Sequence, residues 1–356
     1  MSRAVFPVQD IQESPVDNLV FYPYRFGSIF KEKVWGGRGL ALFLHKDLPP
    51  HKMVGESWEL SDRDADMSIL ENGPRQGSSL RLILRADPAG VLGAEVAQMY
   101  PARFPLLIKY IDAHETLSLQ VHPDDAYAIQ FEHGQWGKME AWYIIHAAPG
   151  AFIYRGVVPG TDRRAFENLL LHKTVRNCLV KLPVKSGDLV FIPPGCLHAT
   201  GRGVLLCEVQ QNSDLTYRVY DWDRLDTTGN GRQLHIEKAL GVVDWDLVSR
   251  EKLAPASAPP AANGSTQRLL HCPKFEIEKI TLQPGQKTAA SVSRRFHVLC
   301  IISGHARINC PSLDASPVQA KMGETYLIPS ALGSYELTAD DTCAALRAFV
   351  PLPETS

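Results

Sequence analysis

Short runs in which apolar and polar residues alternate, interrupted throughout by Gly and Pro, constrain the fold of this chain most strongly. The run from Leu117 to His122 (LSLQVH) is typical, because its apolar residues recur at every second position. Alternation with a period of two, bounded by turn residues, predicts antiparallel strands that bury one face. With 26 Gly and 25 Pro available to end such runs, we expect a mainly β protein.

Helical patterns are fewer, and we expect helices to be additions to the β-structure. One of them ends before Pro101, which is a common stop signal. A content of 45% hydrophobic and 21% charged residues allows a sizeable core, and a length of 356 residues corresponds to about two domains. The expected helices cover residues 79–84, 91–99, 162–172 and 234–240.

One segment differs from the rest of the chain in composition. Residues 254–266 read APASAPPAANGST, with no charge and almost no large apolar side chain. Such a segment cannot bury itself and is typical of a linker. It predicts an N-terminal domain of residues 1–253 and a C-terminal domain of residues 267–356.

The two predicted domains share a faint repeat. GDLVFIPPGCLH begins at Gly187, and GETYLIPSALGS begins 136 residues later at Gly323, so that Gly, Ile and Pro recur in register. His198 ends the first copy, whereas Ser334 ends the second. Copies this far apart indicate two related domains rather than a solenoid. A potential metal ligand is present in only one of them.

The first copy resembles the second conserved motif of the cupin family. That motif is Gly, five residues, Pro, one residue, Gly, two residues and His, which Gly187, Pro193, Gly195 and His198 match. The family's usual Asn four residues after the His is Arg202 here. The resemblance implies two cupin (jelly-roll β-barrel) domains, the second degenerate. A cupin motif indicates this fold more than any one activity.

Polar residues at alternate positions of an apolar strand suggest a site inside the first barrel. In LSLQVHPDD, Ser118, Gln120 and His122 share one face, because side chains two apart in a strand point the same way. Burying these three together is costly unless they have partners. The sequence therefore predicts that this face is used.

A second strand carries a comparable face. In GKMEAWYII, the residues that share a face by alternation are Lys138, Glu140 and Trp142. Imidazole nitrogens combined with carboxylate and amide oxygens suit a divalent ion such as Zn²⁺ and leave open positions for substrate. We therefore expect a metal site built from these strands.

Four motifs together resemble one family closely. QVHPDD, GKxE, PPGxxHA and NSDxxxR occur in the order found in type I mannose-6-phosphate isomerases of the short bacterial form, and WGG at Trp35 and GESWELSDR at Gly55 also fit. The resemblance is strong from Phe21 to Arg224 and faint beyond. It implies interconversion of mannose 6-phosphate and fructose 6-phosphate through a cis-enediol. It also implies one ion, usually Zn²⁺, held by Gln120, His122, Glu140 and His198.

Several residues compete for the catalytic and substrate-binding roles. The proton must be moved by a base of tuned pKa, for which our order of preference is Glu208, then Lys138, then Asp214. The similarity implies that Arg218 pairs with charge on the substrate, because a guanidinium suits phosphate and enediolate oxygens. Compatible with the substrate site are also Ser118 and Lys109.

Structural readings of these residues remain open at this point. Glu208 could be salt-bridged to an Arg, and Arg218 could pair only with Asp214. Lys109 lies within an apolar run and could pair with a core carboxylate, and Ser118 could be a small polar filler. An iron-dependent cupin oxygenase and a non-catalytic sugar-binding cupin are the alternative functions.

Charge and composition narrow the class of partners and the compartment. The 37 Lys and Arg nearly balance the 39 Asp and Glu, which argues against a broad nucleic-acid surface. No apolar stretch approaches the length of about 18 residues needed for a membrane span. Seven scattered Cys without a CxxC motif, and no visible secretory signal, favour a reducing cytoplasm. The oligomeric state stays open.

Overall fold

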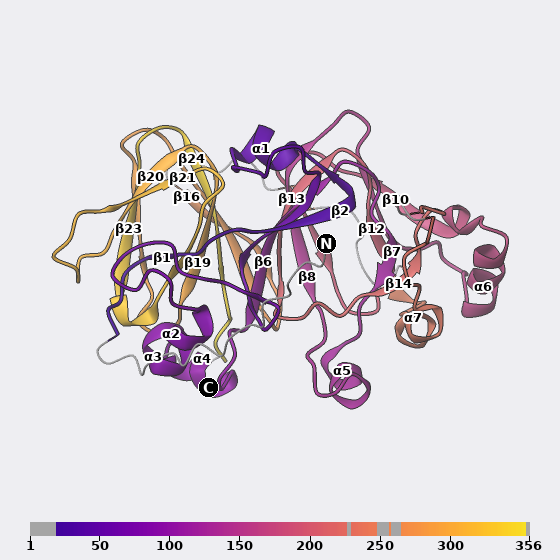
Figure 1. Ribbon diagram of the computed structural model, residues 1–356, viewed down its shortest axis with the longest axis horizontal. Helices are drawn as coiled ribbons and strands as arrows, with labels where there is room; N and C mark the ends of the chain where they lie inside the picture. The colour runs from indigo at the N-terminus through magenta and orange to yellow at the C-terminus, as the bar shows by residue number, and fades with distance from the viewer. Residues whose placement is uncertain (1–18, 226–228, 248–255, 258–264, 354–356) are drawn as a thin grey trace, which may run out of the picture.

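Two units, each made of two sheets, account for most of the chain (Figure 1). The computed structural model describes residues 19–225, 229–247, 256–257 and 265–353. The first two-sheet unit combines a seven-stranded and a five-stranded sheet and lies on the right of Figure 1. The second two-sheet unit combines a six-stranded and a four-stranded sheet and lies on the left. The expectation of a mainly β protein is confirmed.

The first two-sheet unit is antiparallel throughout. Its seven-stranded sheet has the order β15 (Ala256–Ser257), β11 (Asp188–Ile192), β8 (Glu140–Ala147), β13 (Val204–Gln211), β6 (Leu106–Ala113), β3 (Val54–Leu60) and β2 (Ile29–Gly37). Its five-stranded sheet has the order β10 (Leu179–Pro183), β9 (Phe152–Val157), β12 (His198–Thr200), β7 (Leu119–Val121) and β14 (Tyr217–Tyr220).

The second two-sheet unit repeats this plan with fewer strands. Its six-stranded sheet has the order β1 (Tyr24–Arg25), β22 (Thr325–Ile328), β19 (His297–Ser303), β24 (Cys343–Phe349), β17 (Glu276–Leu282) and β16 (Ser265–His271). Its four-stranded sheet has the order β18 (Lys287–Ser291), β23 (Ser334–Ala339), β20 (His305–Asn309) and β21 (Val318–Lys321). A small hairpin joins β4 (Asp62–Arg63) to β5 (Asp66–Met67).

The faint repeat in the sequence is a repeat in the structure. Ile192 of β11 pairs with Glu140 of β8, and Ile328 of β22 pairs with His297 of β19. Gly187 and Gly323 enter these strands with φ values of 92° and 87°, which glycine adopts without steric cost. The second repeat therefore has a buried histidine where the first has Glu140.

The two units share one hydrophobic core. Tyr110 and Val209 lie on one face of the seven-stranded sheet and pack in the same buried cluster as Val298 and Leu346 of the six-stranded sheet. Because side chains alternate along a strand, the opposite face of β6 and β13 is left for other contacts. The N-terminal strand β1 also crosses over and pairs with β22. The large sheets thus pack back to back, and the division into domains at residues 254–266 remains a prediction.

Part of the predicted linker pairs with the first two-sheet unit. Ala256 and Ser257 form β15, which pairs with Leu189 and Asp188 of β11. Ser265 begins β16, which pairs with β17. Residues 254–255 and 258–264 of the predicted linker lie outside the described residues.

Of the four helices expected from the sequence, three are present and one is broken. α2 (Leu80–Ala86), α6 (Arg163–Leu171) and α7 (Ile236–Val242) match three of the four expected segments. The expectation of one helix over residues 91–99 was wrong, because α3 (Pro88–Leu92) and α4 (Ala94–Met99) are separated at Gly93. A Cβ on Gly93 would lie 2.1 Å from the backbone oxygen of Arg294 in the second two-sheet unit. Gly93, with φ of 93°, allows the chain to leave the helical conformation where that unit approaches closely.

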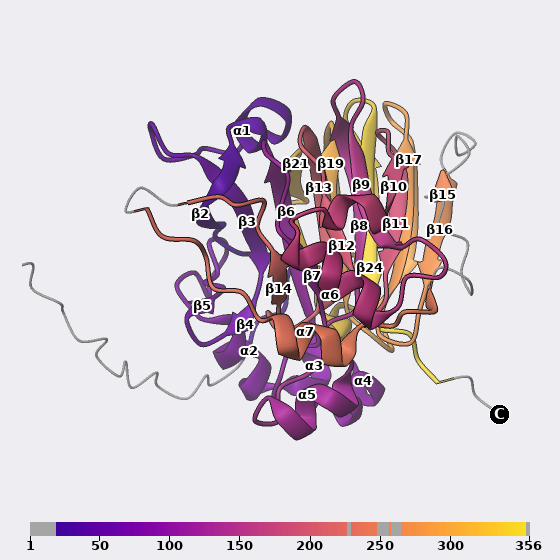
Figure 2. The ribbon, with the colours of Figure 1, turned by 90° about the vertical axis from the view of Figure 1, so that its right-hand side faces the viewer.

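The remaining helices were not expected. They are α1 (Gly39–Leu44), α5 (Asp125–Phe131) and the short 3₁₀ helices η1 (Val175–Cys178) and η2 (Ser330–Leu332). Figure 2 shows α6 and α7 in front of the five-stranded sheet, where they share a buried cluster with its strands. None of the described helices is long and apolar enough to cross a bilayer.

Candidate metal centre and active site

Three buried side chains meet inside the first two-sheet unit. The ligand atoms of His122, Glu140 and His198 all lie within 4.8 Å of one another. His122 follows β7, whereas the other two residues begin β8 and β12. The Nε2 atoms of His122 and His198 lie 3.6 Å and 3.2 Å from the carboxylate of Glu140. Among the described residues this is the one group of three or more His, Cys, Asp or Glu with such geometry.

The hydrogen bonds of the two imidazoles make this cluster suitable for a cation. Nδ1 of His122 lies 2.7 Å from the backbone oxygen of Leu215, and Nδ1 of His198 lies 2.9 Å from that of Cys196. Each Nδ1 can only donate there, so a neutral ring presents its Nε2 lone pair. Both lone pairs therefore face the Glu140 carboxylate, and this arrangement of electron pairs calls for a positive ion between them.

The hydrogen bonding and the pKa shifts of His122 and Glu140 also indicate a cation site. Nε2 of His122 and Oε1 of Glu140 are buried and form no hydrogen bond within the described residues, whereas Oε2 of Glu140 is ion-paired with Lys138. Burial and the ammonium of Lys138 lower the pKa of His122 to about 3, so the ring is neutral at pH 7. Burial alone would raise the pKa of Glu140, but the ammonium of Lys138 outweighs it and holds that pKa well below its ordinary value. The set thus offers the neutral imidazole of His122 and the carboxylate of Glu140 beside the buried ring of His198.

Gln120 adjoins the same cluster. It lies on β7 opposite His198 of β12, and its Nε2 is 3.1 Å from Nε2 of His198. Turning the amide about its terminal bond would present the oxygen at this position instead. The structure therefore brings all four residues of the predicted ligand set together, and ligation by Gln120 stays a prediction.

Lys138 joins the cluster to a second carboxylate. Its Nζ lies 2.8 Å from Oε2 of Glu140 and 3.9 Å from Oε1 of Glu208, and all three residues are buried. Nε1 of Trp142 donates to Oε2 of Glu208 at 3.0 Å. The alternation predicted for residues 138–142 is confirmed by these contacts.

Glu208 occupies an environment that suits a base. Burial raises its pKa, and the nearby carboxylate of Glu140 raises it further, whereas Lys138 and Lys109 act in the opposite direction. Its Oε1 forms no hydrogen bond within the described residues, although Nζ of Lys109 lies 3.5 Å away. The contact with an Arg that we considered from the sequence is absent among the described residues, and its charged neighbours are lysines.

Lys109 is a buried lysine that lies close to two carboxylates and an aromatic ring. Its Nζ lies 3.5 Å from carboxylate oxygens of both Glu208 and Asp214 and stands 4.5 Å from the ring centre of Trp58. Burial would lower the pKa of Lys109, but these two carboxylates and Glu56 outweigh it and raise that pKa. Asp214 pairs with Lys109, so the alternative pairing of Asp214 with Arg218 is wrong.

Arg218 pairs with no carboxylate of the described residues. Its Nε donates to the hydroxyl of Ser118 at 3.3 Å and its Nη1 to the backbone oxygen of Gln233 at 2.8 Å. No ion pair to it is found within the part of the chain that the structure describes. Burial and the nearby Arg232 lower its pKa, yet a guanidinium remains charged near neutral pH. Arg218 is therefore placed to bind an anion.

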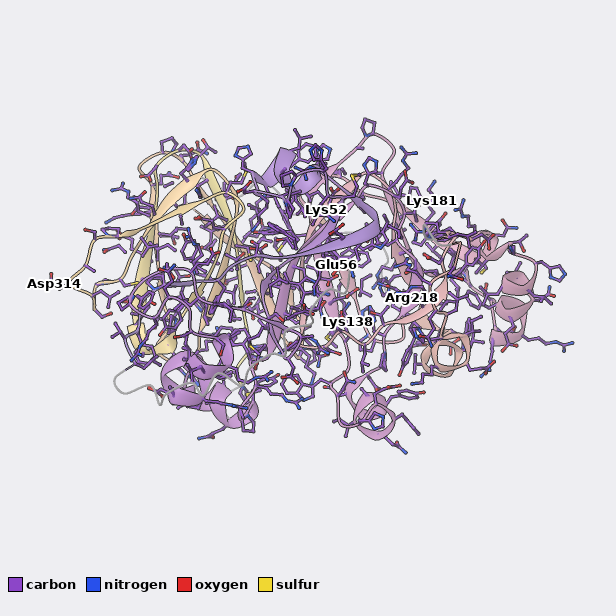
Figure 3. All side chains as sticks on the ribbon, in the orientation of Figure 1. Lys52, Glu56, Lys138, Lys181, Arg218 and Asp314 are labelled. Carbon is purple, nitrogen blue, oxygen red and sulfur yellow. The ribbon has the colours of Figure 1, made fainter. Side chains whose placement is uncertain are left out.

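A cavity of about 240 Å³ collects these groups beside the metal cluster. In Figure 3 the labels of Glu56, Lys138 and Arg218 lie on the first two-sheet unit, whereas Asp314 marks the far end of the second. Five cationic side chains line the cavity and outnumber the three carboxylates, which favours an anionic ligand. Its charged lining residues are Lys33, Glu56, Lys109, Lys138, Glu208, Asp214, Arg218 and Arg232. Ser118 and Gln120 also line it.

Three of the charged lining residues were not predicted. Glu56 accepts from Nε1 of Trp58 at 2.7 Å and pairs with Lys33 at 3.0 Å. Its position in the GESWELSDR motif was the available signal. Arg232 forms an ion pair with Asp221 at 2.5 Å. The same carboxylate also pairs with Arg224. Nothing local in the sequence marks Arg232, because only the turn of the chain after β14 brings it to the cavity.

Comparisons with known proteins agree with this architecture. The sequence model of "phosphomannose isomerase type I, catalytic domain" matches residues 24–144. The chain is 32% identical over 322 residues to the mannose-6-phosphate isomerase of Streptococcus mutans, covering 89% of this chain and 96% of that protein. It is also 32% identical over 322 residues to mannose-6-phosphate isomerase ManA of Bacillus subtilis, covering 90% and 97%.

A solved structure extends the likeness to the fold. The crystal structure of the mannose 6-phosphate isomerase from Bacillus subtilis superposes with a TM-score of 0.80 at 29% identity. The superposition covers 92% of this chain and 99% of that one, so both two-sheet units are included. With full-length relatives above 30% identity and a shared fold, the chain belongs to the type I mannose-6-phosphate isomerase family.

Proposed function

We propose that this protein is an aldose–ketose isomerase that interconverts mannose 6-phosphate and fructose 6-phosphate through a cis-enediol(ate). One observation carries the proposal. Two imidazoles and a carboxylate, grouped as a metal site, lie next to a cavity lined by several cationic side chains. We assign the ion to Gln120, His122, Glu140 and His198, and infer Zn²⁺ from the mixed nitrogen and oxygen donors. The names of the relatives support the substrate and the reaction.

The chemistry requires a proton to leave one carbon of the sugar and return to its neighbour. When bound, a divalent ion polarises the sugar oxygens and stabilises negative charge that develops on them. Glu208 is our first choice of base, because burial and the carboxylate of Glu140 raise its pKa and its Oε1 accepts no hydrogen bond from the described residues. Lys138 lies near it, so its ammonium can hold an oxygen of the substrate or return the proton.

Asp214 ranks below both residues as a base. Burial would raise its pKa, but Lys109 and Lys138 outweigh that effect and lower it. A carboxylate with a lowered pKa binds a proton weakly and is a poorer base at neutral pH. We therefore infer that Asp214 orients Lys109, whose ammonium faces the substrate cavity.

Two other residues of the cavity wall are suited to bind the anionic end of the substrate. Arg218 and Ser118 contact each other at the cavity wall, and Arg218 has no carboxylate partner in the described ranges. A guanidinium can donate two parallel hydrogen bonds to phosphate or to enediolate oxygens. We infer that Arg218 and Ser118 bind a negatively charged part of the sugar phosphate.

The decisive assay is conversion of mannose 6-phosphate by the purified protein in D₂O. An enediol mechanism exchanges the migrating proton with solvent, so the fructose 6-phosphate formed should carry deuterium at C1. Product without solvent deuterium would contradict proton transfer through an exchanging base. Consumption of O₂ would indicate an oxygenase instead, and binding of the sugar phosphate without turnover would indicate a binding module.

Removing the guanidinium of Arg218 should weaken substrate use. We expect Arg218→Met to lower kcat/KM about 10- to 100-fold, because a hydrogen bond to a charged group contributes about 1.5–3 kcal/mol. The measurement is steady-state kinetics with mannose 6-phosphate. Arg307→Met is the control, since Arg307 pairs with Asp340 on the exposed surface of the second two-sheet unit. Equal kcat/KM values for both variants would contradict the role of Arg218.

A further inference from the structure

Hydrogen bonds from neighbouring elements hold the segment that leads into β8. The backbone N–H of Gly137 donates to Oδ1 of Asp125 at 2.8 Å, and that of Met139 donates to Oε1 of Gln211 at 3.0 Å. Gln211 also donates its backbone N–H to the oxygen of Met139 at 3.1 Å. Both backbone amides that flank Lys138 are thus bound to side chains.

These two side chains are joined to each other and to the second two-sheet unit. Nε2 of Gln211 donates to Oδ1 of Asp125 at 2.9 Å. The other carboxylate oxygen of Asp125 lies 2.6 Å from Nζ of Lys274, which stands in the turn between β16 and β17. A continuous chain of contacts therefore runs from Lys274 to the amides on either side of Lys138.

The approach of the backbone at Gly137 makes this connection stiff. A Cβ at this position would lie 2.3 Å from the carbonyl carbon of Asp124 and 2.5 Å from the backbone nitrogen of Asp125. Asp124 is occupied elsewhere, because it caps α5 by accepting from the N–H of Tyr127 at 2.8 Å. Asp125 is therefore the carboxylate that reaches the segment, and a displacement of Asp125 is passed directly to Gly137.

We propose that Lys274, through Asp125 and Gln211, is a positioning residue that lets the second two-sheet unit hold Lys138 in place for the isomerase reaction. The inference rests on the proposed function. Lys138 lies 2.8 Å from Glu140 and 3.9 Å from Glu208, so a small shift of its backbone changes both distances. Catalytic groups displaced by about 1 Å can lose about 100-fold in rate.

The first test removes the link at its far end. We expect Lys274→Met to lower kcat about 5- to 20-fold with KM changed less than twofold, because Lys274 does not line the cavity and a partial shift costs less than a full ångström. Lys274→Arg, which keeps the charge, should restore most of kcat. Amide hydrogen exchange should show faster exchange at Gly137 and Met139 in Lys274→Met.

The matched control removes an ion pair that joins the second two-sheet unit to a different helix, α4 rather than α5. Arg294 precedes β19 and pairs with Glu95 of α4 at 2.7 Å, but no hydrogen bond of that pair leads to the β8 segment. Arg294→Met should leave kcat and the exchange of the amides at Gly137 and Met139 unchanged. Thermal unfolding of both variants measures the loss of stability that each ion pair causes.

A double-mutant cycle completes the test. Asp125→Asn should lower kcat, and Lys274→Met added to it should cause little further loss, because both act through one chain of contacts. Additive losses, or unchanged kcat and amide exchange in Lys274→Met, would overturn the proposal. Absence of turnover in the wild-type protein would instead contradict the proposed function, and the amide exchange would still decide whether Lys274 holds the segment.

Discussion

Replacing His198 by alanine should lower isomerase turnover about 1000-fold or more and abolish stoichiometric metal binding. His198 supplies one of the two Nε2 lone pairs that face Glu140, and its ring is fully buried and oriented by the backbone oxygen of Cys196. Loss of a bound ion removes several kcal/mol of stabilisation of developing charge, and each 1.36 kcal/mol is worth tenfold in rate. The measurements are metal content per chain and kcat/KM after loading with Zn²⁺.

The repeat in the fold supplies a control for this substitution. His297 is also buried and begins β19, at the strand position that corresponds to Glu140. His297→Ala should destabilise the protein by opening a cavity in the second two-sheet unit, yet leave one ion per chain and wild-type turnover. A folded His198→Ala variant with wild-type metal content and activity would refute the assignment of the metal centre.

Glu208→Gln should lower kcat by about 10² to 10⁴, because general-base catalysis contributes that range. The amide oxygen can still accept from Nε1 of Trp142, so the change removes the base while conserving shape. The assay is turnover of mannose 6-phosphate together with solvent deuterium exchange into the sugar, which should fall in parallel. Retention of both rates would move the role of base to Lys138.

The pH dependence of the wild-type protein provides a second readout for Glu208. Burial and the carboxylate of Glu140 raise the pKa of Glu208, so it stays protonated to a higher pH than an ordinary glutamate with a pKa of about 4.3. A base acts only when ionised, so kcat/KM should fall as pH decreases through this raised pKa. An acidic limb at or below the ordinary value would contradict Glu208 as the base. Protein stability measured over the same range separates unfolding from titration.

Much of the candidate site could be read from strand alternation and motif order. Ser118, Gln120 and His122 were expected on one face, and the structure places all three at or beside the cavity. Lys138 and Glu140 were expected together for the same reason and lie 2.8 Å apart. Alternation is local, so it needs no knowledge of the rest of the fold.

Contacts between distant segments could not be read in this way. The pairing of Lys109 with Asp214 rather than Arg218 with Asp214 depends on how β6 lies against the turn after β13. The break at Gly93 depends on an oxygen of Arg294, about 200 residues further along the chain. Such contacts depend on tertiary packing, which overrides local helix propensity.

By itself, the sequence determined the mainly β fold, the repeated strand–turn–strand plan and the three strands that carry the metal-binding pattern, because these depend on short-range periodicity and turn chemistry. The tertiary structure alone decided that Arg232 joins the cavity, that the two large sheets share one core, and that Lys274 is linked to the backbone on either side of Lys138. These features bring together residues far apart in the chain, and only packing of the folded sheets sets their distances.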